Sequence, residues 1–286
     1  MGAFFEEIPV NLIDWILAQK VFWVSTAPLS GNGHVNVSPK GGPPRESFGV
    51  PNTTSFWYMD MTGSGIETIS HLLEPGNGRI TILFNAFEGP PRIVRLWGKG
   101  RVLENGTPEF NEIVQRENIT TMPGTRSVIV VSIHQVGTSC GYKVPFFSFV
   151  DFRHVLEDHF KNKQEKFERG NEKESIDRYW ALKNARSMDG LPGMRRGLKA
   201  GKEYSVEPIQ KMVGPFATST KSLRSQKGVE MHVSYVIIAL LAALVAILAV
   251  THPAFEYFPA QRRMQAVISQ VTSMPGNSPS SVGSHN

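Results

Sequence analysis

The sequence predicts a mainly β protein with flanking helices, built around a closed antiparallel barrel and followed by a transmembrane helix. The first observation is that six stretches within the first 150 residues have period-two character, with only one or two short helical patterns between them. The second is an uncharged apolar run near the C-terminus, Val233 to Val250, that is long enough to cross a bilayer.

The expected strands differ in how clearly their two faces are marked. They are expected at 21–27, 34–38, 56–61, 79–87, 92–103 and 127–134. In 92–103 small or apolar residues suit a barrel interior, whereas the alternate residues suit either solvent or a dimer or ligand surface. The two sets are Val94, Leu96, Gly98, Gly100 and Val102 on one face, and Arg95, Trp97, Lys99 and Arg101 on the other. The second strand presents Asn36, Ser38 and Lys40 on one face and valines on the other.

The stretch "FWYMDMTGSGIETISHLL" (56–73) changes period halfway, from a buried strand to the spacing of a helix that starts at Ile66. Between them lies Thr62-Gly63-Ser64-Gly65. A strand that passes through small residues into a helix leaves backbone N–H groups free to bind an anion, usually a phosphate. An ordinary strand exit with Thr62 or Ser64 as helix cap explains the same residues. The turn is neither a P-loop nor a dinucleotide fingerprint.

Composition divides the chain into five parts. These are a barrel domain (1–150), a charged helical extension that packs on it (151–195), a basic linker (196–232), a transmembrane helix (233–250) and a disordered polar tail (251–286). A buried core helix is the alternative for 233–250, but its flanks lack the composition of a surrounding domain. The acidic N-terminus does not resemble a signal peptide, so we expect a single-pass membrane protein with a cytosolic N-terminal domain.

Charge and cysteine content narrow the classes of partner. The net charge of +5 is not organised into an array of basic and aromatic residues, so nucleic acid is not expected as a partner. Cys140 is the single cysteine, which rules out an intrachain disulfide, and no Cys/His cluster has zinc spacing. No metal site is therefore predicted. Cys140 is either a redox thiol or, more commonly for a lone cysteine, a small packed residue.

Four segments carry a resemblance to a known family. "NVSPKGG", "YMDMTGSGIETISHLLEPGNGRITILFNAFEGPPRIVRLWGKGRV", "TSCGYKVP" and "KNARSMDGLPG" resemble, in order and spacing, a subfamily of pyridoxamine 5′-phosphate oxidase-related proteins. The resemblance covers about residues 5–195. It implies an FMN-binding split β-barrel, a homodimer with two flavin sites at the subunit interface, and a small-molecule substrate. Membrane anchoring through 233–250 would set this chain apart.

The resemblance also implies which residues bind the flavin. They are Lys40, the turn residues Thr62, Ser64, Gly65 and Thr68, and Arg92 or Arg95. The true oxidases carry a Ser-Arg-Lys phosphate clamp where this chain has Ser64-Gly65-Ile66, so both cations are missing. Vitamin B6 phosphate oxidation is therefore not expected, and no catalytic residue stands out.

Two functions follow from this resemblance. The first is an FMN-dependent oxidoreductase with NAD(P)H as a possible electron donor. The alternative is a non-catalytic module that binds flavin or haem as a carrier, sensor or scaffold.

Overall fold

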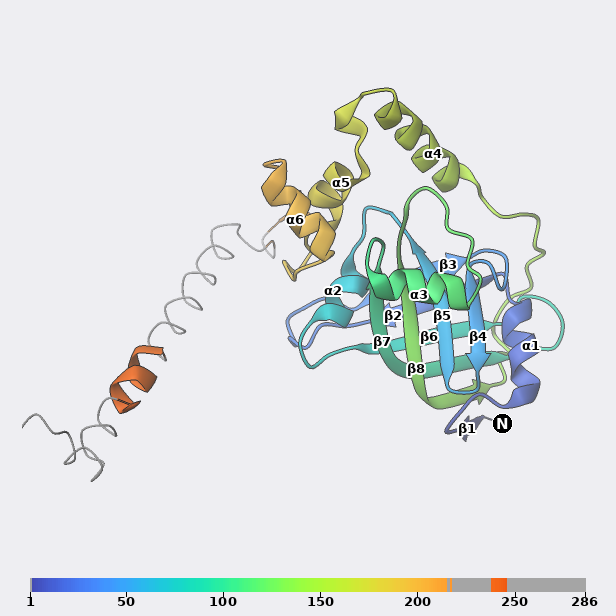
Figure 1. Ribbon diagram of the computed structural model, residues 1–286. Coiled ribbons are helices and arrows are strands. Elements are labelled where there is room, and N and C mark those ends of the chain that lie inside the picture. Colours follow the sequence, from blue (N-terminus) through green and yellow to red (C-terminus); the bar gives the residue numbers. More distant parts are fainter. Residues whose placement is uncertain (1, 215–216, 218–237, 246–286) are drawn as a thin grey trace, which may run out of the picture. The chain divides into compact units, whose positions relative to one another are not determined.

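Eight strands form one curled antiparallel sheet in a computed structural model of the protein, which describes residues 2–214, 217 and 238–245 (Figure 1). The strands run in the order β3-β2-β6-β7-β8-β5-β4, and the short β1 pairs with β8. They are β1 (Ala3–Phe5), β2 (Val21–Thr26), β3 (Asn36–Gly41), β4 (Phe48–Asn52), β5 (Ser55–Met61), β6 (Arg79–Asn85), β7 (Ile93–Glu104) and β8 (Thr125–Ser139). The mainly β architecture and all six predicted strands are thus confirmed.

The expectation of a closed barrel is wrong, because no pairing joins β3 to β4 at the two ends of the sheet. Both edge strands contain a proline, Pro39 in β3 and Pro51 in β4. Proline has no N–H to donate to a neighbouring strand, so it is confined to edges and bulges. The sheet is therefore a curled half-barrel with an open side.

Side chains from both faces of the sheet are buried, in two separate clusters. Phe56 and Tyr58 of β5 belong to the larger cluster, in which Phe22, Phe48 and Phe84 also pack edge to face or tilted. The alternate residues Trp57 and Met59 belong to a second cluster beneath the helix at 108–116. Burial on both faces explains why residues 56–61 are unbroken in apolar character instead of alternating.

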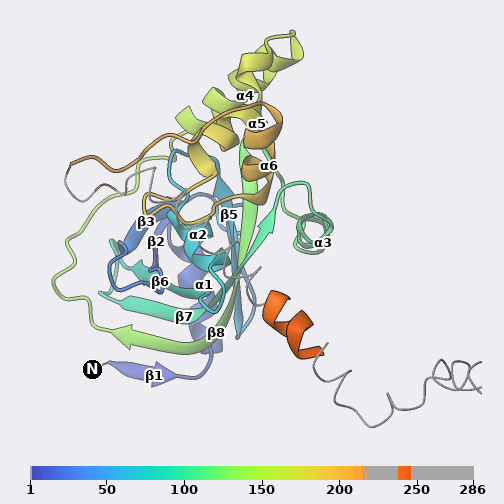
Figure 2. The same ribbon diagram turned by 90° about the vertical axis from the view of Figure 1, so that its left-hand side faces the viewer.

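The helices pack around the sheet. Their bounds are α1 (Val10–Ala18), α2 (Glu67–Leu73), α3 (Pro108–Arg116), α4 (Val155–Glu168), the 3-10 turn η1 (Glu172–Glu174), α5 (Ile176–Tyr179), the π-helical turn η2 (Trp180–Asn184) and α6 (Arg195–Glu203). Figures 1 and 2 show α3 against β7 and β8, with α4, α5 and α6 gathered at one end of the sheet. The helices expected after residue 65 and within 152–190 are confirmed.

The C-terminal part of the chain is described only in pieces. Residues 196–203, which the sequence assigned to the linker, form most of α6, where Gly197 and Ala200 are buried. The chain divides into a unit of residues 1–220 and one of residues 221–286. Of the expected membrane helix at 233–250, only 238–245 are described, and they are helical. Within the described residues no helix has the length and apolar character to cross a bilayer. The tail at 251–286 lies outside the described residues.

Candidate functional site

A cavity of about 430 Å³ lies where the open edge of the sheet meets the turn after β5. Five of the residues predicted to bind a cofactor line it, namely Lys40, Thr62, Ser64, Gly65 and Thr68. Asn36 and Ser38 line it from the same face of β3 as Lys40, while Val37 on the other face is 61% exposed. The predicted alternation of β3 therefore places its polar face toward this cavity, which we call the turn cavity.

A buried carboxylate links the two cations of the turn cavity. Asp60 is fully buried and accepts hydrogen bonds from Lys40 Nζ at 3.0 Å and from Arg126 Nε at 2.6 Å. Burial raises the pKa of Asp60, but the charges and hydrogen bonds of Arg126 and Lys40 outweigh it and lower this pKa to about 2. The three side chains carry a net charge of +1, so they attract an anion while holding each other in place.

The turn offers backbone donors to the same cavity. Among the described residues no hydrogen bond engages the N–H groups of Gly63, Ser64 or Gly65. Ser64 and Gly65 are exposed, and a Cβ added at Gly63 would meet nothing within 4 Å. The N–H of Ile66 is already taken by the Glu67 carboxylate at 2.8 Å. An anion at the turn would therefore meet the amides of 63–65 and not the N–H of Ile66.

The back of the turn is held by the C-terminal segment 175–213, which we call the clamp. Trp180 Nε1 donates to Thr62 Oγ1 at 2.9 Å, and Asn184 Nδ2 donates to Gly63 O at 2.8 Å. Glu67 accepts from Met188 N and pairs with Lys211 at 3.6 Å. These contacts join positions more than 100 residues apart, and they engage the carbonyl of Gly63 while leaving the N–H groups of 63–65 without a hydrogen-bond partner among the described residues.

The two predicted arginines lie elsewhere. Arg95 is on the opposite face of the sheet, where Nη1 donates to Ser139 Oγ at 3.3 Å. Arg92 precedes β7, with its guanidinium carbon 5.5 Å from the ring centroid of Trp15. Neither arginine lines the turn cavity. A site within one chain therefore joins five of the seven predicted residues and leaves the arginines aside.

Arg126 and Asp60 are the residues of this site that sequence reasoning missed. Each is a charged residue at or within an apolar strand, "FWYMDM" for Asp60 and "RSVIVV" for Arg126. Charged residues in such strands are rarely buried unless they are paired. That signal was available, although the sequence could not show that these two residues pair with each other.

A second cavity, of about 1060 Å³, adjoins the first and shares Lys40, Ser47, Met59 and Met61 with it. It lies between α1, β5 and the loop that joins β8 to α4, which passes α1 in Figure 1. We call it the strap cavity, after that loop (residues 140–154, the strap). Lys40 therefore stands at the junction of two connected spaces.

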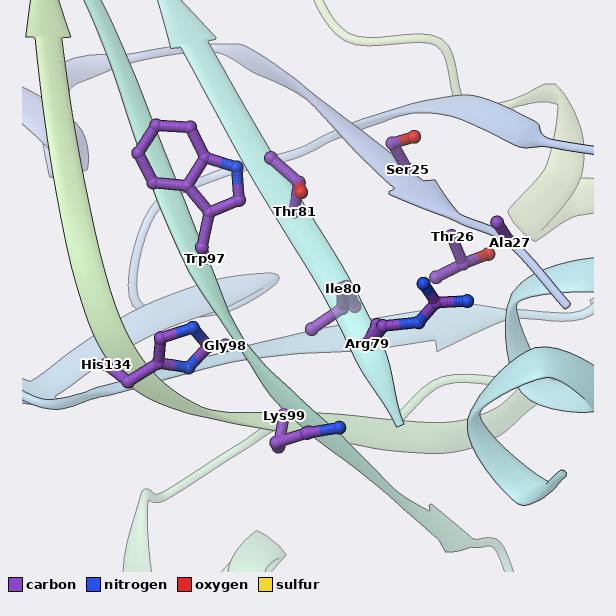
Figure 3. Close-up of a pocket in the computed structure, with 10 residues that line it drawn as sticks. All are labelled: Ser25, Thr26, Ala27, Arg79, Ile80, Thr81, Trp97, Gly98, Lys99 and His134. Atoms are coloured by element: carbon purple, nitrogen blue, oxygen red, sulfur yellow. The ribbon is translucent and has the colours of Figure 1, made fainter. Parts of the chain in front are cut away.

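A smaller depression of about 330 Å³ lies on the outer face of the sheet (Figure 3). Arg79, Lys99 and His134 line it together with Trp97. Lys99 Nζ donates to the carbonyl oxygen of Asn77 at 2.7 Å, and Arg79 Nε donates to Asn77 Oδ1 at 3.1 Å. These cations therefore hydrogen-bond to neutral acceptors, whereas the cations of the turn cavity pair with the buried carboxylate of Asp60.

Comparison with known proteins places the chain in a family. It is 39% identical over 209 residues to the pyridoxamine 5′-phosphate oxidase family protein ustO of Aspergillus flavus, covering 71% of this chain and 82% of ustO. The chain belongs to the pyridoxamine 5′-phosphate oxidase family. No family model matches the sequence.

Solved structures similar to this chain include HupZ of Group A Streptococcus. The identity is 15% and the TM-score 0.33, and the match covers 45% of this chain and 92% of HupZ. Another is the FAD binding protein from Mycobacterium smegmatis, at 12% identity and a TM-score of 0.33. This match covers 47% of this chain and 97% of that protein.

Proposed function

We propose that this member of the pyridoxamine 5′-phosphate oxidase family binds FMN at the turn cavity and acts as an oxidoreductase on a small molecule. One observation carries the proposal. A single cavity is lined by Lys40, Arg126 and residues 63–65, whose N–H groups are unengaged among the described residues, at the place where the family resemblance puts the flavin phosphate.

The charge of Arg126 compensates for the two cations of the Ser-Arg-Lys phosphate-binding group, which the turn lacks. Where the resemblance leads one to expect Ser-Arg-Lys, Gly65 and Ile66 supply no cation. Arg126 instead enters from β8, and its Nη1 donates to Gly65 O at 2.6 Å, so its charge lies beside the turn. A phosphate would meet Lys40 and Arg126 as charge-assisted donors and the backbone amides as neutral ones.

The connected cavities suit a cofactor with a charged end and a planar end. The turn cavity accepts the phosphate, and the junction at Lys40 leads to the methionines Met59 and Met61. The flavin would supply the redox chemistry, and the chain would bind it and exclude water around its ring. Lys40 would then position the cofactor rather than exchange protons with it, because Asp60 holds its ammonium group.

A homodimer is part of the proposal. The outer sheet face carries half-buried Trp23, Trp97 and Arg95 and exposed Val37. A second copy laid on this face would cover the aromatic residues and bring Arg95 toward the partner's site, which gives a role to an arginine that lies outside the turn cavity of its own chain. NAD(P)H as donor, the membrane anchor at 233–250 and the cytosolic position of the barrel stay predictions from the sequence.

The test compares FMN binding to the full chain and to three lysine variants. We expect Lys40→Ala to weaken FMN binding at least tenfold, measured by quenching of flavin fluorescence, and Lys40→Arg to restore most of it. Lys161→Ala removes an exposed lysine of α4 that lines neither cavity and is expected to change the affinity less than twofold. Equal binding by all three variants would contradict the proposed site.

Anaerobic addition of NADPH to the loaded protein then separates the two functions. Bleaching of the flavin absorbance supports the oxidoreductase. A bound flavin that stays oxidised with NADPH and with NADH supports the alternative, a flavin-binding module without turnover.

A further inference from the structure

We propose that the strap cavity binds the substrate, and that this substrate is an apolar planar molecule that carries no phosphate group. The inference rests on the proposed function, because it assigns a substrate class to the same site. It follows from three properties of the cavity, namely its sulfur floor, its aromatic wall and the sign of its charge.

Three methionines form the floor. Met59 and Met61 come from the same face of β5, and Met122 comes from the loop before β8. The hydroxyl of Thr125 lies 3.3 Å from Met59 Sδ and 3.6 Å from Met61 Sδ, which holds the two thioethers side by side. Polarisable thioethers pack well against aromatic rings and adapt to different ring shapes.

Aromatic side chains of the strap form the opposite wall. Phe147 N donates to Phe87 O at 3.2 Å, and Phe149 N donates to the side-chain oxygen Glu88 Oε1 at 3.1 Å. Two hydrogen bonds donated by the strap backbone therefore hold this part of the strap over the cavity. Phe147 and Phe149 remain 59% and 43% exposed. A planar apolar molecule between them and the methionines would remove this apolar surface from water.

The charges around the cavity disfavour a phosphate. Three cations line it, Lys20, Lys40 and Arg153, against four carboxylates, those of Glu46, Glu88, Asp151 and Glu157. The lining is thus net negative by one, whereas the lining of the turn cavity, Lys40 and Arg126 against Glu67, is net positive by one. A dianion would be repelled from the strap cavity and attracted to the turn cavity.

The size of the strap cavity leaves room for a substrate beside the cofactor. Its volume of about 1060 Å³ lies just above the range for sites that hold one drug-sized ligand, about 300–1,000 Å³. The cofactor's phosphate end has the separate turn cavity of about 430 Å³. The two spaces together therefore exceed what one ligand fills.

Equilibrium dialysis of the full chain, saturated with FMN, against the neutral probe N-phenyl-1-naphthylamine tests the inference. The decisive variant is Phe147→Ser combined with Phe149→Ser, and the matched control is Phe146→Ser, since Phe146 is 80% exposed and does not line the cavity. We expect the double variant to lose at least fivefold in probe affinity and the control less than twofold. An equal concentration of pyridoxal 5′-phosphate should leave the bound probe in place.

The visible absorbance of bound FMN in the same samples keeps the two proposals apart. Protein that binds FMN but no probe, or from which pyridoxal 5′-phosphate displaces the probe, overturns the substrate assignment and leaves the proposed function standing. Equal loss in the double variant and the control also overturns it. Protein that binds no FMN overturns the proposed function, and the substrate assignment falls with it.

Discussion

At the scale of single residues, Asp60 determines how the turn cavity is charged. It is fully buried in an apolar strand and balances Lys40 and Arg126 at once. If a neutral side chain replaced it, two cations would remain without their shared partner, one of them 5% exposed. Breaking a buried ion pair from one side costs about 3–5 kcal/mol.

We therefore predict that Asp60→Asn lowers the free energy of unfolding at neutral pH by about 3 kcal/mol or more. Urea unfolding followed by circular dichroism measures it. Asp158→Asn, at an exposed position on α4, is the control and should change stability by less than about 0.5 kcal/mol. Similar losses in the free energy of unfolding for the two variants would contradict the prediction, because the buried carboxylate would then stabilise the fold no more than an exposed one.

The pKa of Asp60 also predicts how stability depends on pH. Its pKa falls from the usual 3.8 to about 2 on folding, so the unfolded chain takes up this proton first as the pH falls. This difference in pKa stabilises the folded state by about 2 kcal/mol. The stabilisation is complete above about pH 4 and is lost as the pH drops through about 2. The slope of stability against pH in this window should be shallower in Asp60→Asn than in the wild type, and equal slopes would contradict the assignment.

At the scale of elements, the clamp sets the geometry of the turn. Trp180 is 2% exposed, its indole N–H donates to Thr62 Oγ1, and the Arg196 guanidinium lies 4.8 Å from its ring. Trp180→Phe keeps a buried ring but removes the hydrogen bond, which leaves the Thr62 hydroxyl buried without it. We expect a loss of about 1–3 kcal/mol in stability and a further loss in FMN affinity. Trp57→Phe, in the buried cluster beneath α3 and outside the lining of both cavities, is expected to leave FMN affinity within twofold.

The attachment of α4 depends on one glycine. Phe160 is the buried residue of α4, and Gly124 has φ +88° with its missing Cβ only 2.6 Å from the Phe160 ring. Gly124→Ala should destabilise the protein by at least about 1 kcal/mol more than Gly170→Ala. Gly170 has φ +95° and open space around it, so it shares the backbone strain without the clash. Urea unfolding gives the difference, and limited proteolysis should show α4 cleaved faster in Gly124→Ala. Equal effects of the two changes would contradict the role assigned to Phe160.

At the scale of the whole molecule, local patterns predicted the strands that have regular alternation or continuous burial. The alternation of β7 was read correctly, with Val94 and Leu96 buried and Lys99 exposed. The edge strand β4 was missed because its sequence "FGVPN" contains glycine, proline and asparagine, which are typical of turns. Closure of the barrel was wrongly expected, because pairing between two distant edge strands depends on the residues at those edges. The period of the apolar residues along a strand does not report it.

The candidate site was predictable to the extent that it is local. The turn 62–68 could be named from the sequence because strand, turn and helix follow one another there. Lys40 could be named from the polar face of its own strand together with the family resemblance. The pairing of Asp60 with Arg126, and the contacts of Trp180 and Asn184 with the turn, join residues 66 to 121 positions apart. Such long-range contacts leave no period or spacing in a single sequence.

The central claim is that the turn cavity holds the phosphate of a flavin, and one comparison tests it most directly. Calorimetric titration of the full chain with FMN and with riboflavin measures the contribution of the phosphate alone, since the two ligands share the same ring and ribityl chain. We predict that FMN binds at least tenfold more tightly than riboflavin, and that Lys40→Ala removes most of this difference. Equal affinities for the two ligands in the wild-type protein would contradict the phosphate site.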